Sequence, residues 1–158
     1  MKNFVKKNFK FVVIGGVLLL LLIIIIIFII IKTNKITTLN CTLKEDTDVW
    51  AKINTNIEIK FKNNKIKNVN ISKDETINEE FEKYTNYFYN SFGSQYYELR
   101  GLEGVDMDTT QDGNKISFKA SINMKKLGYD KVIYPITDVK DNYKKVKNDL
   151  TEKGYACK

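Results

Sequence analysis

The chain has 158 residues, a formal net charge of +7 and no histidine. Of its 26 basic residues six lie in residues 1–35, which contain no acid, and this leaves 20 basic against 19 acidic residues from Ile36 onward. The nearly neutral remainder gives no support to nucleic-acid binding, which needs a basic surface on the folded domain. The missing histidine removes the commonest general base and a common metal ligand.

An uninterrupted apolar run extends from Phe11 to Ile31. As a helix, with 1.5 Å of rise per residue, it would be about 31 Å long, close to the roughly 30 Å hydrocarbon core of a bilayer. The run therefore predicts a single transmembrane helix over 11–31, preceded by a short basic segment, 1–10, and followed by a stalk, 32–40. The basic segment can also meet anionic lipid headgroups.

Lysines on the two sides of the run predict its orientation. Four precede it and two follow it closely, which places the N-terminus in the cytoplasm and the C-terminal domain outside, at the cell membrane. A cleaved signal peptide is an alternative, but the run is long for one and no small-residue cleavage site follows. A lipoprotein leader is another, but Asn40 stands before Cys41 where a small residue would be needed. We expect an uncleaved signal anchor.

The two cysteines, Cys41 and Cys157, lie near the two ends of the predicted extracytoplasmic domain, 41–158. Outside the cytoplasm such a pair is expected to be oxidised, so we predict a disulfide that ties the C-terminus to the first strand. Two free thiols are the alternative if the domain faces the cytoplasm. A third cysteine or a histidine to complete a metal site is absent, so we expect no metal and no cofactor.

The first half of the domain has the pattern of β-strands. Ile36–Leu43 predicts a first strand, and strict alternation from Val49 to Phe61 predicts a long strand with one buried face. The residues expected on that face are Ala51, Ile53, Thr55, Ile57, Ile59 and Phe61. Lys62–Lys65 predicts a turn, because asparagine tolerates positive φ. The returning strand, with Ile66, Val69 and Ile71, breaks phase once, which predicts a bulge.

A helix is predicted next. Thr76 and Glu79 have the spacing of a capping box, and Gly101 can close the helix after Leu99, with a kink at Gly93. Its apolar stripe consists of Ile77, Phe81, Tyr84, Phe88, Phe92, Tyr96 and Leu99. The simplest interpretation is a helix that covers the sheet. Tyr87, Tyr89 and Tyr97 lie off the stripe and form a possible contact surface for a protein or polymer, since tyrosine supplies large area at low entropy cost.

A second hairpin is predicted from 104–110 and 115–123, with a type I′ turn at Asp112-Gly113. Asp106, Asp108 and Asp112 invite a calcium site, but the positions that follow do not fit an EF-hand loop. A connection over 124–136 leads to a final helix capped by Thr137 or Asp138 and ended by Gly154. The expected fold class is α+β: an N-terminal single transmembrane helix, then an antiparallel sheet of two hairpins plus a first strand, with helices packed on one face.

Three stretches resemble one group of bacterial proteins: FKNNKIKNV at 61–69, GLEGVDMDTTQDGNKISFKASIN at 101–123, and GYACK at 154–158. In these the chain is similar to small membrane-anchored extracytoplasmic proteins grouped with the YehR-like lipoproteins. The resemblance implies an α+β domain at the outer face of the membrane and no particular activity. The chain departs from that group in lacking a lipidation motif, so Cys41 does not inherit a lipidated role, and no functional residues carry over.

The residues predict no catalytic site. The chain has neither a glycine-rich phosphate loop nor a serine nucleophile elbow, and both cysteines are accounted for by the bridge. We therefore expect a non-enzymatic binding or envelope-associated module on a single-pass membrane anchor, whose partner is an envelope protein or polymer. The alternatives are an accessory subunit of a membrane protein complex and an enzyme of unfamiliar type.

Overall fold

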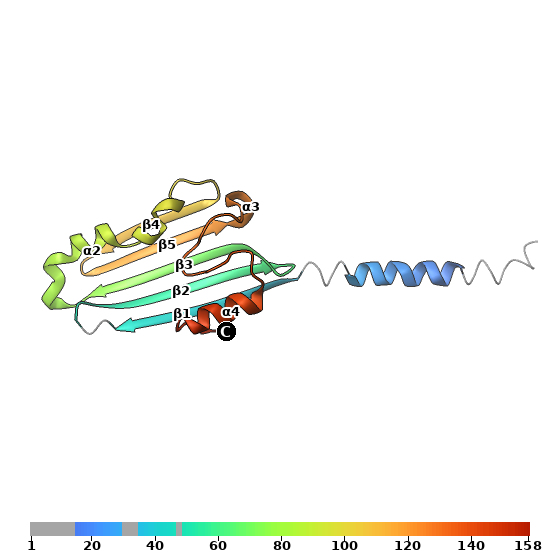
Figure 1. Cartoon of the computed structure of the whole chain (residues 1–158), viewed down its shortest axis with the longest axis horizontal. Helices are drawn as coiled ribbons and strands as arrows, with labels where there is room; N and C mark the ends of the chain where they lie inside the picture. Colours follow the sequence, from blue (N-terminus) through green and yellow to red (C-terminus); the bar gives the residue numbers. More distant parts are fainter. Residues whose placement is uncertain (1–14, 30–34, 47–48) are drawn as a thin grey trace, which may run out of the picture. The chain divides into compact units, whose positions relative to one another are not determined.

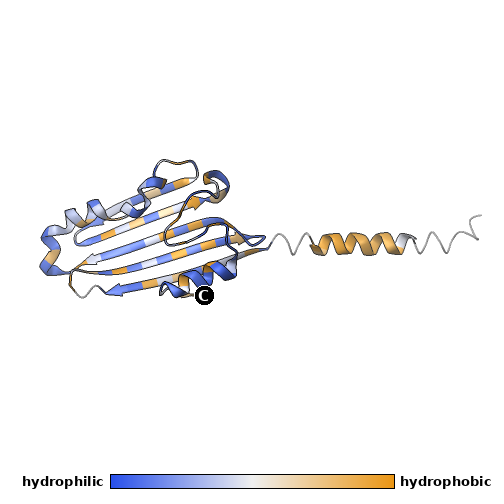
Figure 2. Ribbon diagram, viewed as in Figure 1, coloured by the Kyte–Doolittle hydropathy of each residue, from blue (hydrophilic) through white to orange (hydrophobic). Residues whose placement is uncertain are grey.

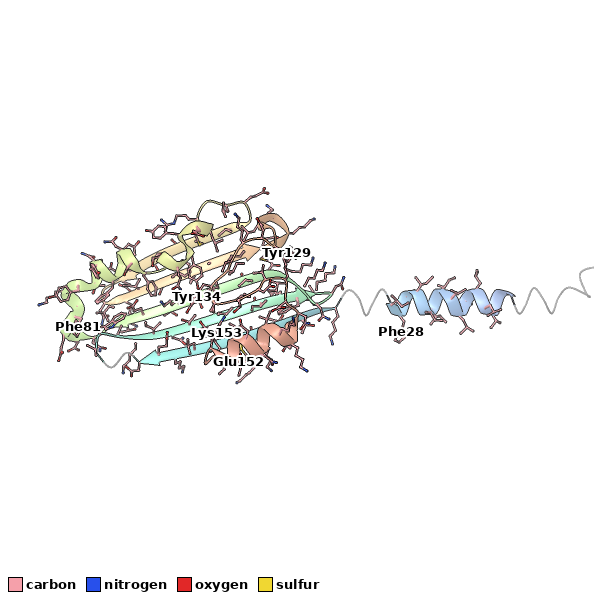
Figure 3. The ribbon with its side chains drawn as sticks, viewed as in Figure 1. Phe28, Phe81, Tyr129, Tyr134, Glu152 and Lys153 are labelled. Carbon is pink, nitrogen blue, oxygen red and sulfur yellow. A yellow bond between two sulfur atoms is a disulfide. The ribbon has the colours of Figure 1, made fainter. Side chains whose placement is uncertain are left out.

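The computed structural model describes residues 15–29, 35–46 and 49–158. The chain forms two compact units, residues 1–35 and 36–158, and each is described by itself. Within the first unit, residues 15–29 are helical and uniformly apolar apart from two glycines (Figure 2). Phe28 is 72% exposed, the highest value among the large apolar side chains of this helix (Figure 3).

The structure contradicts the prediction of a transmembrane helix. Among the described residues, no helix is both long and apolar enough to cross a membrane. Positions 11–14 and 30–31 of the predicted span, the basic segment 1–10 and residues 32–34 of the stalk lie outside the described residues.

The second unit is an α+β fold built on a six-stranded antiparallel sheet (Figure 1). The strand order is β4-β5-β3-β2-β1-β6, and every neighbouring pair is antiparallel. The strands are β1 (Ile36–Asp46), β2 (Ala51–Lys62), β3 (Lys65–Ile77), β4 (Val105–Asp112), β5 (Lys115–Asn123) and β6 (Ala156–Cys157). The helical segments are η1 (Glu79–Tyr84), α2 (Thr85–Ser91), η2 (Ser94–Leu99), α3 (Met124–Leu127) and α4 (Tyr143–Glu152).

Alternation along the strands separates a buried face of the sheet from a polar one. In β2 the predicted face is buried at every position from Ala51 to Phe61, while the intervening residues are partly or fully exposed. The strand register continues the buried face across the sheet, because Ile57 lies opposite both Cys41 of β1 and Ile71 of β3. Figure 2 shows the same alternation as bands of opposite hydropathy.

The helical segments and the 128–142 connection cover the buried face. Their inward residues share one apolar core with the strands: Tyr96, Leu99, Ile133, Ile136, Val139, Val146 and Leu150. At roughly 25 cal/mol per Å² of apolar surface, burying a large side chain contributes about 1.5–3 kcal/mol, so this core is the main source of stability. In the part of the chain that the structure describes, no helix packs on the opposite face of the sheet.

The first hairpin forms as predicted, and the second differs in its turn. Asn63 and Asn64 have φ of 55° and 58°, as a type I′ turn requires. The predicted bulge is confirmed, since the pairing shifts beyond Lys60 and leaves Lys67 of β3 unpaired. In the second hairpin, however, Asp112 pairs with Lys115, and only Gly113 of the two turn residues has positive φ. This is the pattern of a type II′ turn, so the predicted type I′ turn is wrong.

The predicted capping box at the start of the first helix is also wrong. Strand β3 runs on through Thr76 to Ile77, because the Ile77 N–H donates to the Asn114 carbonyl at 2.9 Å. The Asn78 N–H then donates to the Trp50 carbonyl, also at 2.9 Å, and no side chain caps the segment that follows. The residues that the local pattern assigned to a helix start therefore belong to strand β3, because long-range strand pairing holds them there.

The predicted continuous helix is three short segments. Between α2 and η2, Phe92 is extended and Gly93 has φ of 79°. A Cβ on Gly93 would lie 2.9 Å from a ring carbon of Phe118, so both the backbone conformation and the close approach require glycine. The predicted kink at Gly93 is therefore a complete break, which lets Tyr96 stack on Phe118 with ring centroids 4.8 Å apart.

The last helix begins later than predicted. Asp138 accepts a hydrogen bond from the Lys140 N–H at 2.8 Å, in a local turn instead of a helix cap. The actual N-cap is Asn142, whose side chain accepts from the Lys145 N–H at 3.1 Å. Near the other end lies Lys153 (labelled in Figure 3), whose ammonium nitrogen is 3.0 Å from a carboxylate oxygen of Asp149. Hydrogen bonds from Lys153 and Thr137 outweigh the effect of burial and leave the pKa of Asp149 below its usual value.

Removal of this cap should destabilise the domain measurably. We expect Asn142→Ala to lower the free energy of unfolding by about 1 kcal/mol, because the Lys145 N–H, in the first turn of α4, loses its side-chain acceptor. Urea denaturation of the full chain measures the change. Asn142→Ser keeps an acceptor and is the control, expected within about 0.5 kcal/mol of the natural chain. Equal stability of the alanine and serine variants would contradict the assigned cap.

A candidate binding surface on the polar face of the sheet

Two rows of polar side chains cross the uncovered face of the sheet. The strand register aligns one residue from each of β1, β2, β3, β5 and β4 in each row, perpendicular to the strands. The first row is Asn40, Glu58, Asn70, Ser121 and Asp106, and the second is Thr42, Asn56, Ser72, Lys119 and Asp108. Because the side-chain period of a strand is two, all ten project from the same face.

Hydrogen bonds between neighbouring strands order these side chains. In the first row the Ser121 hydroxyl donates to Asn70, and the Asn70 amide donates to Glu58, each at 2.9 Å. In the second row the Thr42 hydroxyl donates to Asn56 at 2.9 Å. The bond from Asn70, and then that from Lys60 at 3.2 Å, hold the pKa of Glu58 below its usual value. This carboxylate is therefore charged at neutral pH.

The two rows line a shallow groove of about 530 Å³. Its walls present amide and hydroxyl groups that both donate and accept hydrogen bonds, three carboxylates (Glu58, Asp106, Asp108) and one ammonium, Lys119. Such a surface can hold a polar or positively charged ligand through several ordered hydrogen bonds. Two of the three carboxylates, Asp106 and Asp108, lie on β4, where both are exposed.

The structure brings Cys41 and Cys157 together across 116 residues of sequence, with their sulfur atoms at bonding distance and their Cα atoms 4.1 Å apart. The pairing of β6 with β1 holds them in place. The Asn40 N–H donates to the Lys158 carbonyl at 3.2 Å, and the Lys158 N–H donates back at 2.8 Å. The bridge lies at the β6 edge of the sheet, and Cys41 is among the residues that line the groove.

The three tyrosines proposed as a partner surface have different environments. Tyr87 on α2 is 72% exposed, and Tyr97 on η2 is 55% exposed with the Arg100 guanidinium 5.0 Å from its ring centre. Tyr89 is half-buried, and its hydroxyl donates to the Thr109 carbonyl of β4 at 3.1 Å. The break at Gly93 separates Tyr97 from the other two along the chain. Tyr89 thus contacts the sheet, while Tyr87 and Tyr97 face solvent.

A metal centre is not formed by the described side chains, among which no group of three or more histidine, cysteine or acidic residues could hold an ion. Asp112, the third member of the acidic set noted in the sequence, lies at the hairpin end of β4 and outside the groove.

Sequence reasoning missed one acidic residue, Glu75, on the buried face of β3. Its side chain lies between Ile53 of β2 and Ile116 of β5 in the strand register and is only 3% exposed. One carboxylate oxygen, Oε1, has no hydrogen-bond partner among the described residues. Burial raises the pKa of this carboxyl, and Lys73 partly opposes the rise. The alternation of Val69 and Ile71, continued along the strand, would have predicted that Glu75 lies on the buried face.

Two solved structures of bacterial proteins are similar to this chain. No family model matches the chain, and no curated protein matches it. An NMR structure of a protein from Streptococcus pneumoniae TIGR4 is similar over 79% of this chain and 86% of its own, with 14% identity and a TM-score of 0.49. The NMR structure of the Escherichia coli YehR protein is similar over 75% of this chain and 88% of its own, with 11% identity and a TM-score of 0.51.

The second likeness shows a shared fold. The resemblance to the YehR-like group is therefore confirmed at the level of the α+β fold. It does not extend to lipid attachment or to a place in the membrane, since identity of 11% carries the fold alone.

Proposed function

We propose that residues 36–158 form a non-enzymatic binding module that acts outside the cytoplasm, as an envelope-associated domain. The observation that carries the proposal is the uncovered polar face, where two rows of ordered side chains line one groove across five strands. The cysteine pair at bonding distance supports an oxidising compartment, because cytoplasmic thiols are kept reduced. The proposed ligand is a protein or polymer of the envelope, held by hydrogen bonds and by the carboxylates near β4.

Site-specific photo-crosslinking in cells tests whether the groove is the contact surface. A photoreactive amino acid is placed at Ser72 or Ser121, both of which line the groove. The matched control position is Thr151, an exposed residue of α4, which packs on the opposite face. We expect an adduct of the same mass from both groove positions and none from Thr151. Absence of adducts from the groove, or the same adduct from the control position, would overturn the proposal.

A further inference from the structure

Strand β4 is an edge of the sheet, and among the described residues β5 is its strand neighbour (Figure 1). In a two-residue hairpin the closing pair is hydrogen-bonded, and bonded and non-bonded pairs then alternate along the ladder. The closing pair here is Asp112 with Lys115. It follows that Asp106, Asp108, Thr110 and Asp112 bond to β5. The backbone groups of the alternate residues, Val105, Met107, Thr109 and Gln111, point away from the sheet.

Two observed hydrogen bonds support this assignment. The Val105 N–H donates to the Leu102 carbonyl at 3.2 Å, and the Thr109 carbonyl accepts from the Tyr89 hydroxyl at 3.1 Å. Both groups are therefore directed away from β5. Within the described part of the chain, the N–H groups of Met107, Thr109 and Gln111 remain available to a further strand, as do the carbonyls of Val105, Met107 and Gln111.

The side chains of β4 define what such a strand should carry. On the polar face Asp106, Asp108 and Asp112 are all exposed. On the other face Val105 and Met107 are half-buried against the core. Opposite charges directly across two strands stabilise the pairing, and apolar pairs also stabilise a ladder. The complementary segment therefore alternates basic and apolar residues.

We propose that β4 takes up an extended peptide segment of a partner protein as an additional antiparallel strand, with basic residues beside the aspartates and apolar residues beside Val105 and Met107. This inference rests on the proposed binding function and names the partner class. Backbone hydrogen bonds supply affinity, and the alternating side chains supply specificity. A second copy of this chain is a poor occupant, since antiparallel β4–β4 pairing sets aspartates near aspartates, and like charges across strands are destabilising.

The probe is the synthetic peptide acetyl-TKVKVKVT-amide, added to the full chain. In the antiparallel arrangement the valines lie directly opposite the outward-pointing residues of β4, so their amides bond to the free carbonyls there. At Thr109 the amide of the added strand takes the place of the Tyr89 hydroxyl, which donates to that carbonyl in the free chain. We expect hydrogen exchange at the amides of Met107, Thr109 and Gln111 to slow by about tenfold or more, measured by NMR. The amides of Asp108 and Thr110, already bonded to β5, should not change in the same titration.

Two N-methylated versions of the peptide, equal in charge, distinguish strand addition from purely electrostatic attraction to β4. Methylation of the valine amides should weaken binding by about tenfold or more, since each lost hydrogen bond costs severalfold, whereas methylation of the lysine amides should leave affinity within about threefold. Equal binding of the two probes, the opposite order, or unchanged exchange at the three amides would overturn the inference.

A further control changes acidic residues of the protein instead of the peptide. The double variant Asp106→Asn with Asp108→Asn should weaken binding of the unmethylated probe by about threefold or more. The double variant Glu79→Gln with Glu80→Gln removes the same charge from exposed positions of η1 and should leave binding of the probe unchanged. Equal weakening by both pairs would contradict recognition at β4. If strand addition fails while groove adducts persist, this inference falls and the binding function stands. Loss of the groove adducts would remove the binding function itself.

Discussion

Removal of the Cys41–Cys157 bridge is expected to lower the free energy of unfolding by about 4–5 kcal/mol, the largest effect of any change considered for this domain. The bridge closes a loop with a sequence separation of 116 residues, so its loss restores much conformational entropy to the unfolded chain. It also releases β6, which pairs with β1 through only two residues. Urea denaturation of the full chain, with and without reductant, measures the effect.

The double variant Cys41→Ala with Cys157→Ala gives the same comparison without reductant. Ala156→Ser, an exposed change in the same strand, is the matched control and should leave stability unchanged. Thiol mass-tagging before and after reduction verifies the state of the natural chain, and a tag that appears only after reduction identifies the bridge. A denaturation midpoint that does not move on reduction would contradict a stabilising role.

Replacement of Glu75 by leucine is expected to stabilise the domain at neutral pH by about 1–3 kcal/mol, because it removes a buried carboxylate with an unpaired oxygen. The carboxylate lies between two isoleucines in the register with one oxygen unsatisfied, and a buried polar group without a partner costs free energy. Leucine fills a similar space and adds to the apolar packing of Ala51, Ile77 and Ile116 nearby.

The gain should depend on pH in a direction set by the raised pKa. The folded carboxyl holds its proton above the ordinary value of 4.5, so the folded state binds more protons than the unfolded state in that range. Stability of the natural chain therefore falls as pH rises from about 4.5 through the folded pKa, and the penalty is complete above it. The advantage of Glu75→Leu should be largest at neutral pH and shrink in acid.

Denaturation at a series of pH values measures this dependence. Glu75→Gln keeps the shape of the side chain but cannot ionise, so it should lose the pH-dependent part of the difference. Glu80→Gln, at an exposed position of η1, is the control for a general change of charge. A stabilisation by leucine that is the same at every pH would mean that packing, and not the ionisation of Glu75, is responsible.

The strands show how much of the fold could be predicted from local sequence pattern. The buried face of β2, the two asparagines of the first turn and the bulge in β3 were all predictable, because alternation and positive φ are properties of a few neighbouring residues. The cysteine pair was predictable from composition and position alone. The apolar run 11–31 was equally clear as a pattern, yet among the described residues no helix is long and apolar enough to cross a membrane.

The region from Thr76 to Leu99 shows where local pattern failed. The apolar residues do recur at helical spacing, but pairing of Ile77 with the second hairpin removed the predicted helix start. The backbone then breaks at Gly93, where Tyr96 stacks on Phe118. Tyr89 was predicted as a free contact residue, and its hydrogen bond to Thr109 could be seen only in the folded arrangement. Contacts between distant segments outweigh helix propensities of a few tenths of a kcal/mol per residue.

The sequence by itself determined the α+β character of the domain, the two hairpins and the choice of buried face, since these follow from side-chain period and turn chemistry. Only the tertiary structure decided the strand order, the alignment of ten polar residues into two rows, the burial of Glu75 and the direction of the free backbone groups on β4. Each of these depends on register between strands far apart in the chain. Register is selected by the core as a whole and not by any single segment.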